Sequence, residues 1–308
     1  MTAPKASLTR RRWFRFVLAA AIAGNLIGAG GAMYMLGDAH DLTVDEAVRK
    51  FRAINAAASS APSASPTATP SALASATAAS RAKKRADKPG AAGGSSTTST
   101  AGKTFEDLET GVYVYDTEGY EETDALSGQR HDYPEQTTIT ASDHACGVRF
   151  TWQPLKERWD RSDTCIRNGD VELVRFAIYH EFFHKGITED FALEAGSVVL
   201  PREAKAGDTW RWKGASDDSK IDTLTKVIGF ETIQVGGVAV HTMHIRYETA
   251  MSGANEGTQI QDRWHATDTG ILVRLVNDVD ARVVVPFGGT AHYVEHYRID
   301  LISTKPQG

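Results

Sequence analysis

The 308-residue chain lacks the motifs of several common enzyme classes. It has no glycine-rich phosphate-binding loop and no Gly-x-Ser-x-Gly elbow, and no pair of carboxylates stands out from its acidic background. It also lacks the alternation of strands and helices that builds a parallel sheet. These absences disfavour a hydrolase with a nucleophile motif, and nothing in the sequence predicts a cofactor.

Basic residues are scarce in the C-terminal two-thirds of the chain. Residues 1–104 hold 14 Lys and Arg against 5 Asp and Glu, whereas residues 105–308 hold 20 against 34. An acidic globule argues against nucleic acid as a partner, because binding to phosphates needs a basic patch.

Only two cysteines are present, Cys146 and Cys165. No cysteine follows the N-terminal apolar segment, so a lipoprotein anchor is not expected. The pair are either free core thiols or one disulfide. If the domain is extracytoplasmic, the disulfide is favoured and would contribute roughly 3 kcal/mol in the loop-entropy model.

Charge is absent from residues 16–36, which are long enough and apolar enough to cross a bilayer as a helix. A basic tail, residues 1–15, precedes them, and Asp38 and Asp41 follow. The positive-inside rule therefore predicts a single-pass protein of the cell membrane, with a cytoplasmic N-terminus and an extracytoplasmic C-terminal domain. A cleaved signal peptide is the alternative, with Gly37-Asp38-Ala39 as its cleavage site.

Small residues recur along this apolar segment, at Ala20, Gly24, Gly28 and Ala32. A spacing of four places them on one helix face, where they permit close approach of a second helix. We therefore predict possible self-association of the anchor. The simpler explanation is that Gly and Ala are common in membrane helices.

Two segments connect the anchor to the globular part. Residues 42–52 predict a short amphipathic helix, in which Thr43 and Glu46 fit a capping box, and which would rest on the membrane or pair with its own copy. Residues 53–104 are mostly Ala, Ser, Thr, Pro and Gly. This composition cannot bury enough apolar surface to fold, so we predict a disordered stalk.

From residue 105 to residue 308, alternating and aromatic-rich runs are broken by Gly, Pro, Asn and Asp. This sequence pattern predicts one mainly β, antiparallel domain, and the length of the runs favours a curved sheet or a partly closed barrel. The predicted strands include 171–184, 271–276 and 281–285.

Two β-rich runs flank Gly236-Gly237 within residues 225–248. A Gly-Gly pair between alternating apolar runs predicts a tight hairpin, because primed turns need positive φ at their central positions. In the resulting register, Val235 faces Val238, Phe230 faces Met243 and Ile228 faces Ile245. One face of this ribbon then forms an apolar surface that we predict to bind a ligand: Ile228, Phe230, Met243, Ile245 and Tyr247.

The string His180-Glu181-Phe182-Phe183-His184 matches HExxH, which on a helix brings two histidines to a zinc ion beside a glutamate general base. The residues before it are β-branched and aromatic, however, and alternate as a strand face does. Four residues along a strand span about 13 Å, whereas zinc ligands lie about 2 Å from the metal. A strand therefore cannot make this site from the motif alone.

A second zinc-like string, the inverted HxxEH pattern, runs from His292 to His296 and includes Glu295. It also lies in a strand-like run. Two rival protease motifs in one chain are better explained as histidines on sheet faces, and we expect no metal at either string.

Two resemblances follow from these residues. The hairpin of residues 226–246, followed by Trp264 and Thr269-Gly270, resembles the lipoprotein-carrier half-barrels of the LolA/LppX type, whose curved sheet holds acyl chains. The basic anchor, the TVDEAVRKFR helix, the Ala/Ser/Pro stalk and the two cysteines flanking LKERW are similar to membrane-anchored extracytoplasmic β-domain proteins of actinobacteria. These likenesses imply a sensor or carrier architecture by analogy.

Three functions are consistent with the sequence. The first is a non-enzymatic envelope protein that binds an apolar or amphiphilic ligand, such as a lipid, in a curved β-sheet. The second is a zinc-dependent metallopeptidase that uses Glu181 with His180 and His184. The third is a structural or protein-interaction module of the cell envelope.

Overall fold

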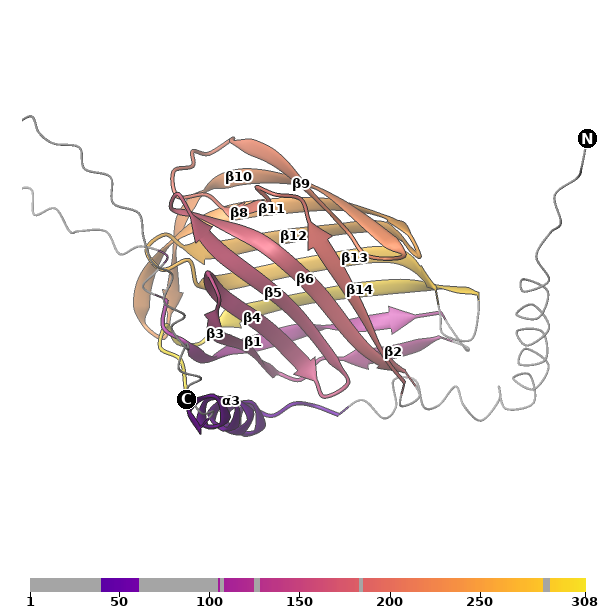
Figure 1. Ribbon diagram of the computed structural model, residues 1–308, viewed down its shortest axis with the longest axis horizontal. Helices are drawn as coiled ribbons and strands as arrows, with labels where there is room; N and C mark the ends of the chain where they lie inside the picture. Colours follow the sequence, from indigo (N-terminus) through magenta and orange to yellow (C-terminus); the bar gives the residue numbers. More distant parts are fainter. Residues whose placement is uncertain (1–39, 61–104, 106–107, 125–127, 183–184, 285–288) are drawn as a thin grey trace, which may run out of the picture.

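The computed structural model describes residues 40–60, 105, 108–124, 128–182, 185–284 and 289–308. Figure 1 shows the arrangement of its elements. They are α3 (Val44–Ser60), β1 (Gly111–Thr123), β2 (Gln129–Asp132), β3 (Gln136–His144), β4 (Gly147–Leu155), β5 (Arg158–Arg167), β6 (Asp170–Phe182), β7 (Lys185–Leu193), β8 (Val198–Leu200), β9 (Thr209–Ala215), β10 (Ser219–Val235), β11 (Val238–Gly253), β12 (Asn255–Ala266), β13 (Leu272–Val284) and β14 (Thr290–Leu301).

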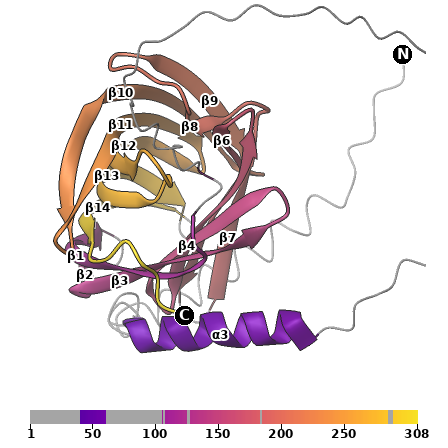
Figure 2. The same cartoon turned by 90° about the vertical axis from the view of Figure 1, so that its left-hand side faces the viewer.

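Twelve of these strands close into an antiparallel barrel. The order around the sheet is β14-β13-β12-β11-β10-β9-β7-β6-β5-β4-β3-β1, and β1 pairs with β14 to complete the ring seen in Figure 2. β2 pairs with the last residues of β1, beyond the part of β1 that pairs with β3. β8 pairs with β6. The predicted mainly β, antiparallel fold is confirmed, and the sheet is fully closed rather than partly closed. The predicted strands 271–276 and 281–285 are one continuous strand, β13.

The ring is least continuous between β7 and β9. These strands pair only at Ala192–Ala215 and at Leu193–Gly214 among the described residues. Side chains add to the contact next to these pairs: Glu189 of β7 accepts hydrogen bonds from the hydroxyl of Ser216, which follows β9, at 2.9 Å and from the amide of Asn255 in β12 at 2.5 Å.

The β10–β11 hairpin forms around the predicted Gly-Gly turn. Gly236 and Gly237 have φ of 55° and 81°, and Val235 pairs with Val238 and Phe230 with Met243, as the sequence predicts. The prediction that Ile228 faces Ile245 is wrong, because a β-bulge shifts the register between Val227 and Gly229 and brings Val227 opposite Ile245. The inserted residue moves every pairing beyond the bulge by one position from the predicted register.

Helix α3 packs on the outside of the barrel, where it crosses beneath β1 and β3 (Figure 2). Its N-terminus is a capping box: the Glu46 N–H donates to Thr43 Oγ1 at 3.3 Å, and the Thr43 N–H donates to Glu46 Oε2 at 3.2 Å. The barrel therefore covers the apolar face that we expected to meet a membrane or a second copy. The residues of this contact are Leu42, Ala47, Val48, Phe51 and Val112.

The chain reaches α3 along the turn between β4 and β5. Asp41 forms a β-bridge with Leu155, and the Lys156 N–H donates to the His40 carbonyl at 2.8 Å. His40 also binds Glu157, whose Oε2 accepts a hydrogen bond from the His40 N–H at 2.8 Å. The helix predicted over residues 42–52 overlaps α3, which continues to Ser60.

The predicted anchor, residues 16–36 with Ala20, Gly24, Gly28 and Ala32, lies outside the described residues, as do residues 61–104 of the predicted stalk. Within the described part, no helix has the length and apolar character needed to span a membrane.

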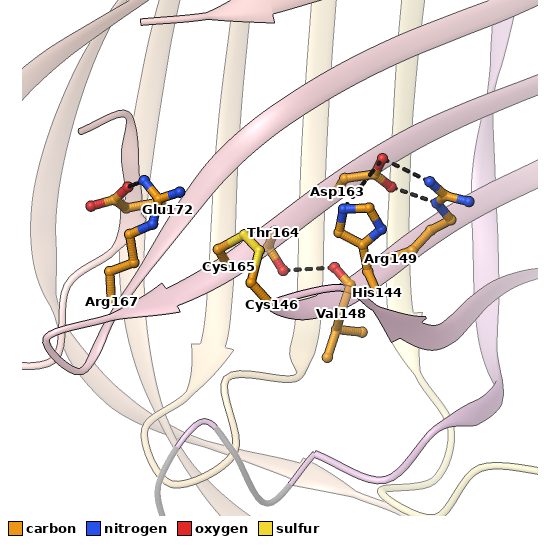
Figure 3. Close-up of a disulfide and its surroundings, with 9 residues drawn as sticks. All are labelled: His144, Cys146, Val148, Arg149, Asp163, Thr164, Cys165, Arg167 and Glu172. Atoms are coloured by element: carbon orange, nitrogen blue, oxygen red, sulfur yellow. Dashed lines mark hydrogen bonds and ion pairs between the residues drawn. A yellow bond between two sulfur atoms is a disulfide. The ribbon is translucent and has the colours of Figure 1, made fainter. Parts of the chain in front are cut away.

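The two cysteines form a disulfide, as predicted. Their Cα atoms are 4.8 Å apart, and the bond joins the turn between β3 and β4 to β5 (Figure 3). Beside it, Arg149 binds Asp163 through two hydrogen bonds of 2.5 and 2.8 Å, and the Thr164 hydroxyl donates to the Val148 carbonyl at 2.7 Å. The covalent link thus fixes a part of the wall that polar contacts already hold.

Replacing both Cys146 and Cys165 by alanine is expected to lower the free energy of unfolding by about 3 kcal/mol, because the link restricts a 19-residue separation in the unfolded chain. Urea denaturation of the double variant and the wild type measures the difference. Reducing the wild type should reproduce the loss, and an unchanged unfolding midpoint in both cases would contradict the expectation.

Candidate functional site

The barrel encloses a cavity of about 370 Å³. This volume falls in the range of about 300–1,000 Å³ that small-molecule sites occupy. Because side chains alternate between the two faces of a strand, every second residue of each wall faces the interior. Most of the lining is apolar, including Val148, Phe150, Leu173, Phe176, Ile178, Phe191, Ile221, Met251 and Val279.

Two apolar lining residues remain open to solvent. Val284, at the end of β13, is 54% exposed, and Ile187, near the start of β7, is 38% exposed. Large apolar side chains that both line the cavity and meet solvent indicate where the cavity reaches the surface.

A buried charge occupies one part of this interior. Arg158, the first residue of β5, is only 4% exposed, and its Nη1 donates to Glu121 Oε2 at 2.7 Å and lies 2.5 Å from Glu295 Oε1. It also donates to the hydroxyls of Tyr133 and Tyr293. One guanidinium therefore joins side chains from β1, β14 and the segment after β2.

The tyrosines complete the cluster around the two carboxylates. The Tyr293 hydroxyl donates to Glu121 at 3.0 Å, and the Tyr133 hydroxyl donates to Glu295 at 2.5 Å. Buried ions are tolerated only when pairing and hydrogen bonding offset their loss of hydration. Both carboxylates meet that condition here.

An aromatic platform lies against the guanidinium. The Trp152 ring stacks on the Tyr297 ring at 4.5 Å between centroids, and the Arg158 guanidinium carbon is 5.3 Å from the Trp152 ring and 5.6 Å from the Tyr133 ring. These distances are within reach of a cation–π attraction. The platform holds the Arg158 side chain in place.

A chain of polar contacts continues from Glu295 along the opposite wall. The Asn277 amide donates to Glu295 Oε2 at 3.0 Å, the Gln261 amide donates to Asn277 Oδ1 at 2.9 Å, and Arg263 donates to Gln261 Oε1 at 2.6 Å. These residues belong to β14, β13 and β12, so the polar contacts follow three neighbouring strands and reach β5 through Arg158.

Burial and charge set the protonation of the cluster. Burial opposes ionisation of Glu121, but the positive charge of Arg158 outweighs it and the pKa of Glu121 lies below its usual range. Burial raises the pKa of Asp160 to about 6, against the opposing charges of Arg158 and Arg263. Burial, together with Arg158, lowers the pKa of His180 to about 4, so this imidazole is neutral at pH 7.

The HExxH string lies on a strand. His180 and Glu181 are neighbours in β6 and face opposite sides: His180 lines the cavity, whereas Glu181 accepts a hydrogen bond from the Tyr179 hydroxyl at 2.9 Å. His184 lies outside the described residues. Among the residues that are described, no three His, Cys, Asp or Glu side chains are grouped so that they could hold a metal ion.

The inverted string is divided between the two faces of β14. His292 binds Asp280 at 2.8 Å and His296 binds Asp278 at 2.5 Å, and all four side chains are exposed to solvent. Glu295, in contrast, is buried in the interior cluster. The strand period of two explains this division.

Three of the five residues of the predicted apolar ligand surface lie together in the structure. Met243, Ile245 and Tyr247 are buried in one cluster with Leu200 and Val227, and Tyr247 also lines the cavity. The other two, Ile228 and Phe230, are 40% and 53% exposed. Any role of this set in binding remains a prediction.

The Arg158 cluster is not evident from the sequence. Its charged members come from strands far apart in the chain, and a charge on the inward face of a strand breaks the usual alternation. One signal was present: Glu295 lies between Tyr293 and Tyr297 at a spacing of two. A carboxylate flanked by aromatic residues on one strand face indicates burial with partners.

No protein-family model matches the chain, and no match was found among curated proteins. Comparison with solved structures finds the crystal structure of the hypothetical lipoprotein YmcC from Escherichia coli (K12), at 12% identity and a TM-score of 0.27, over 63% of this chain and 90% of that chain. A likeness at this TM-score carries no argument about function, and the resemblances drawn from the sequence motifs remain resemblances.

The Arg158→Gln substitution is expected to destabilise the protein by about 3–5 kcal/mol, because it leaves two buried carboxylates without their counter-charge. Urea denaturation at pH 7 measures the loss. The control is Arg211→Gln, which removes an exposed ion pair with Asp222 and should change stability by no more than about 0.5 kcal/mol. Equal effects of the two variants would contradict the buried cluster.

The raised pKa of Asp160 predicts a pH dependence with a defined sign. A carboxyl that holds its proton more tightly when folded stabilises the protein below its unfolded pKa of about 4, and this contribution is lost as pH rises through the folded value of about 6. Relative to Asp160→Asn, the free energy of unfolding of the wild type should fall by up to about 1.4 kcal/mol per pH unit as pH rises across this window. Denaturant titrations of both proteins from pH 4 to 8 test this, and a difference that is constant with pH would disprove it.

Proposed function

We propose that the protein binds an apolar or amphiphilic small molecule inside the barrel and acts without catalysing a reaction. The observation that carries this proposal is the cavity of about 370 Å³ with its mainly apolar lining. A concave apolar site with a few convergent polar groups is the common form of a small-molecule binding site.

The distribution of polarity supports an amphiphile. The apolar side chains of β4, β6 and β7 offer a surface for a hydrocarbon chain, and Arg158, Asp160 and Glu295 supply polar groups that line the same cavity. A molecule with an oily part and a polar end would meet both. Val284 and Ile187 would provide an apolar lip for its entry.

The proposed location rests on the sequence. A single-pass anchor at residues 16–36 would place the barrel outside the cytoplasm, where the Cys146–Cys165 disulfide is chemically favoured. In that setting an envelope lipid is a suitable ligand class. Self-association through Ala20, Gly24, Gly28 and Ala32 remains part of this proposal.

Binding can be tested with N-phenyl-1-naphthylamine, an uncharged apolar fluorophore, added to the full-length chain in lipid nanodiscs. The wild type should enhance its fluorescence saturably above the signal of empty nanodiscs. Ile178→Trp and Val279→Trp, which add bulk to facing walls of the cavity, should each weaken binding at least tenfold, because the probe would lose its space.

The matched control is Val238→Trp, which adds the same side chain at an exposed position next to the hairpin turn and should bind as the wild type does. Circular dichroism checks that each variant is folded. If the wild type shows no saturable binding, or if the cavity variants bind unchanged, the proposal fails and the structural or interaction module becomes the better explanation.

A further inference from the structure

Three buried polar atoms in the barrel interior have no hydrogen-bond partner among the residues that the structure describes. They are Nε of Arg158, Oδ1 of Asp160 and Nε of Arg263. All three residues line the cavity. Buried polar atoms in folded proteins are nearly always hydrogen-bonded, so each exception indicates a missing partner.

The three residues come from facing walls of the barrel. Arg158 and Asp160 are alternate residues of β5 and share its inner face, whereas Arg263 is on β12, half the ring away. Arg263 nonetheless acts on the pKa of Asp160 through its charge. A continuous set of polar contacts, from Arg158 through Glu295, Asn277 and Gln261 to Arg263, joins the two walls at this level.

Several other atoms of these side chains are engaged. Arg158 Nη1 is held by Glu121 and Glu295, Arg158 Nη2 approaches Asp160 Oδ2 at 3.7 Å, and Arg263 Nη2 donates to Gln261. The buried atoms that lack a partner are two N–H donors and one carboxylate acceptor. A partner that satisfies them must both accept and donate hydrogen bonds.

Charge narrows the class of partner. The two guanidinium groups are accompanied by three carboxyl groups, those of Glu121, Glu295 and Asp160. A bound anion would add to the excess of negative charge, and a bound cation would lie against two guanidinium N–H donors that it cannot satisfy. A hydroxyl group accepts from a guanidinium and donates to a carboxylate without adding charge.

We infer that the ligand is an amphiphile with an uncharged, hydroxyl-bearing head, such as a monoacylglycerol, whose hydroxyls bind between Asp160, Arg158 and Arg263. This inference rests on the proposed function and specifies the polar end of the same cavity. The acyl chain lies along the apolar walls of β6 and β13.

Displacement of N-phenyl-1-naphthylamine from the full-length chain in nanodiscs at pH 7.5 compares three amphiphiles of equal chain length. They are monolauroylglycerol, laurate and dodecyltrimethylammonium, with free concentrations measured by dialysis. Monolauroylglycerol should displace the probe at a free concentration at least tenfold lower than either charged amphiphile. Equal or tighter binding of laurate or of the ammonium compound would overturn the inference.

Variants locate the head group. Arg263→Met and Arg263→Lys both remove the Nε donor, the second while keeping the charge. Each should weaken the binding of monolauroylglycerol about tenfold more than it changes the binding of the apolar probe, measured on the same variant. Arg274→Met, on the outer face of β13 and paired with Asp300, is the control and should have no effect. Unchanged affinity for monolauroylglycerol in both Arg263 variants would show that water alone satisfies the site.

The two proposals fail in different ways. If the probe itself does not bind, or binds the Ile178→Trp variant as well as the wild type, the cavity is not a ligand site. If the probe binds in the cavity but the three amphiphiles are not distinguished, ligand binding stands and only the choice of head group is refuted.

Discussion

The structure depends on the burial of one positive charge, that of Arg158, between the carboxylates of Glu121 and Glu295. Removing an ion from water costs several kcal/mol, and only good pairing offsets that cost. Here the pairing is supplied by β1 and β14, the two strands whose contact completes the ring. Satisfying the guanidinium therefore requires the barrel to be closed, and closing the barrel brings its partners together. The polar cluster and the topology stabilise each other.

The same cluster gives the interior a polar end that an apolar core would lack. Tyr133, Trp152 and Tyr297 fill the space beside Arg158, whereas the lining between β6 and β13 is apolar and encloses open volume. Close packing near the charge holds the polar groups in position, and looser packing away from it leaves room for a guest. Rigid polar groups beside an adaptable apolar space are the arrangement that fixes the orientation of a bound molecule.

Local features of the chain were predictable and non-local ones were not. The alternation of apolar and polar residues predicted the antiparallel strands, and Gly236-Gly237 predicted the hairpin. The β-branched and aromatic residues before His180 predicted a strand where the HExxH motif suggested a helix. The bulge before Gly229 leaves no mark in hydrophobic alternation, yet it changes which residues pair across the hairpin. Closure of the ring and the cluster around Arg158 join segments more than 100 residues apart, as the separation of Arg158 and Tyr293 shows. No pattern within one strand reports such contacts.

Helix α3 changes how the segments before the barrel are to be understood. Residues 40–60 are held on the barrel wall, by the packing of α3 and by the bridge between Asp41 and Leu155. The described chain therefore meets the barrel first at the β4–β5 turn, well before β1 begins. If residues 16–36 cross a bilayer, as proposed, the β4–β5 turn would be the first part of the barrel that the chain reaches from the membrane.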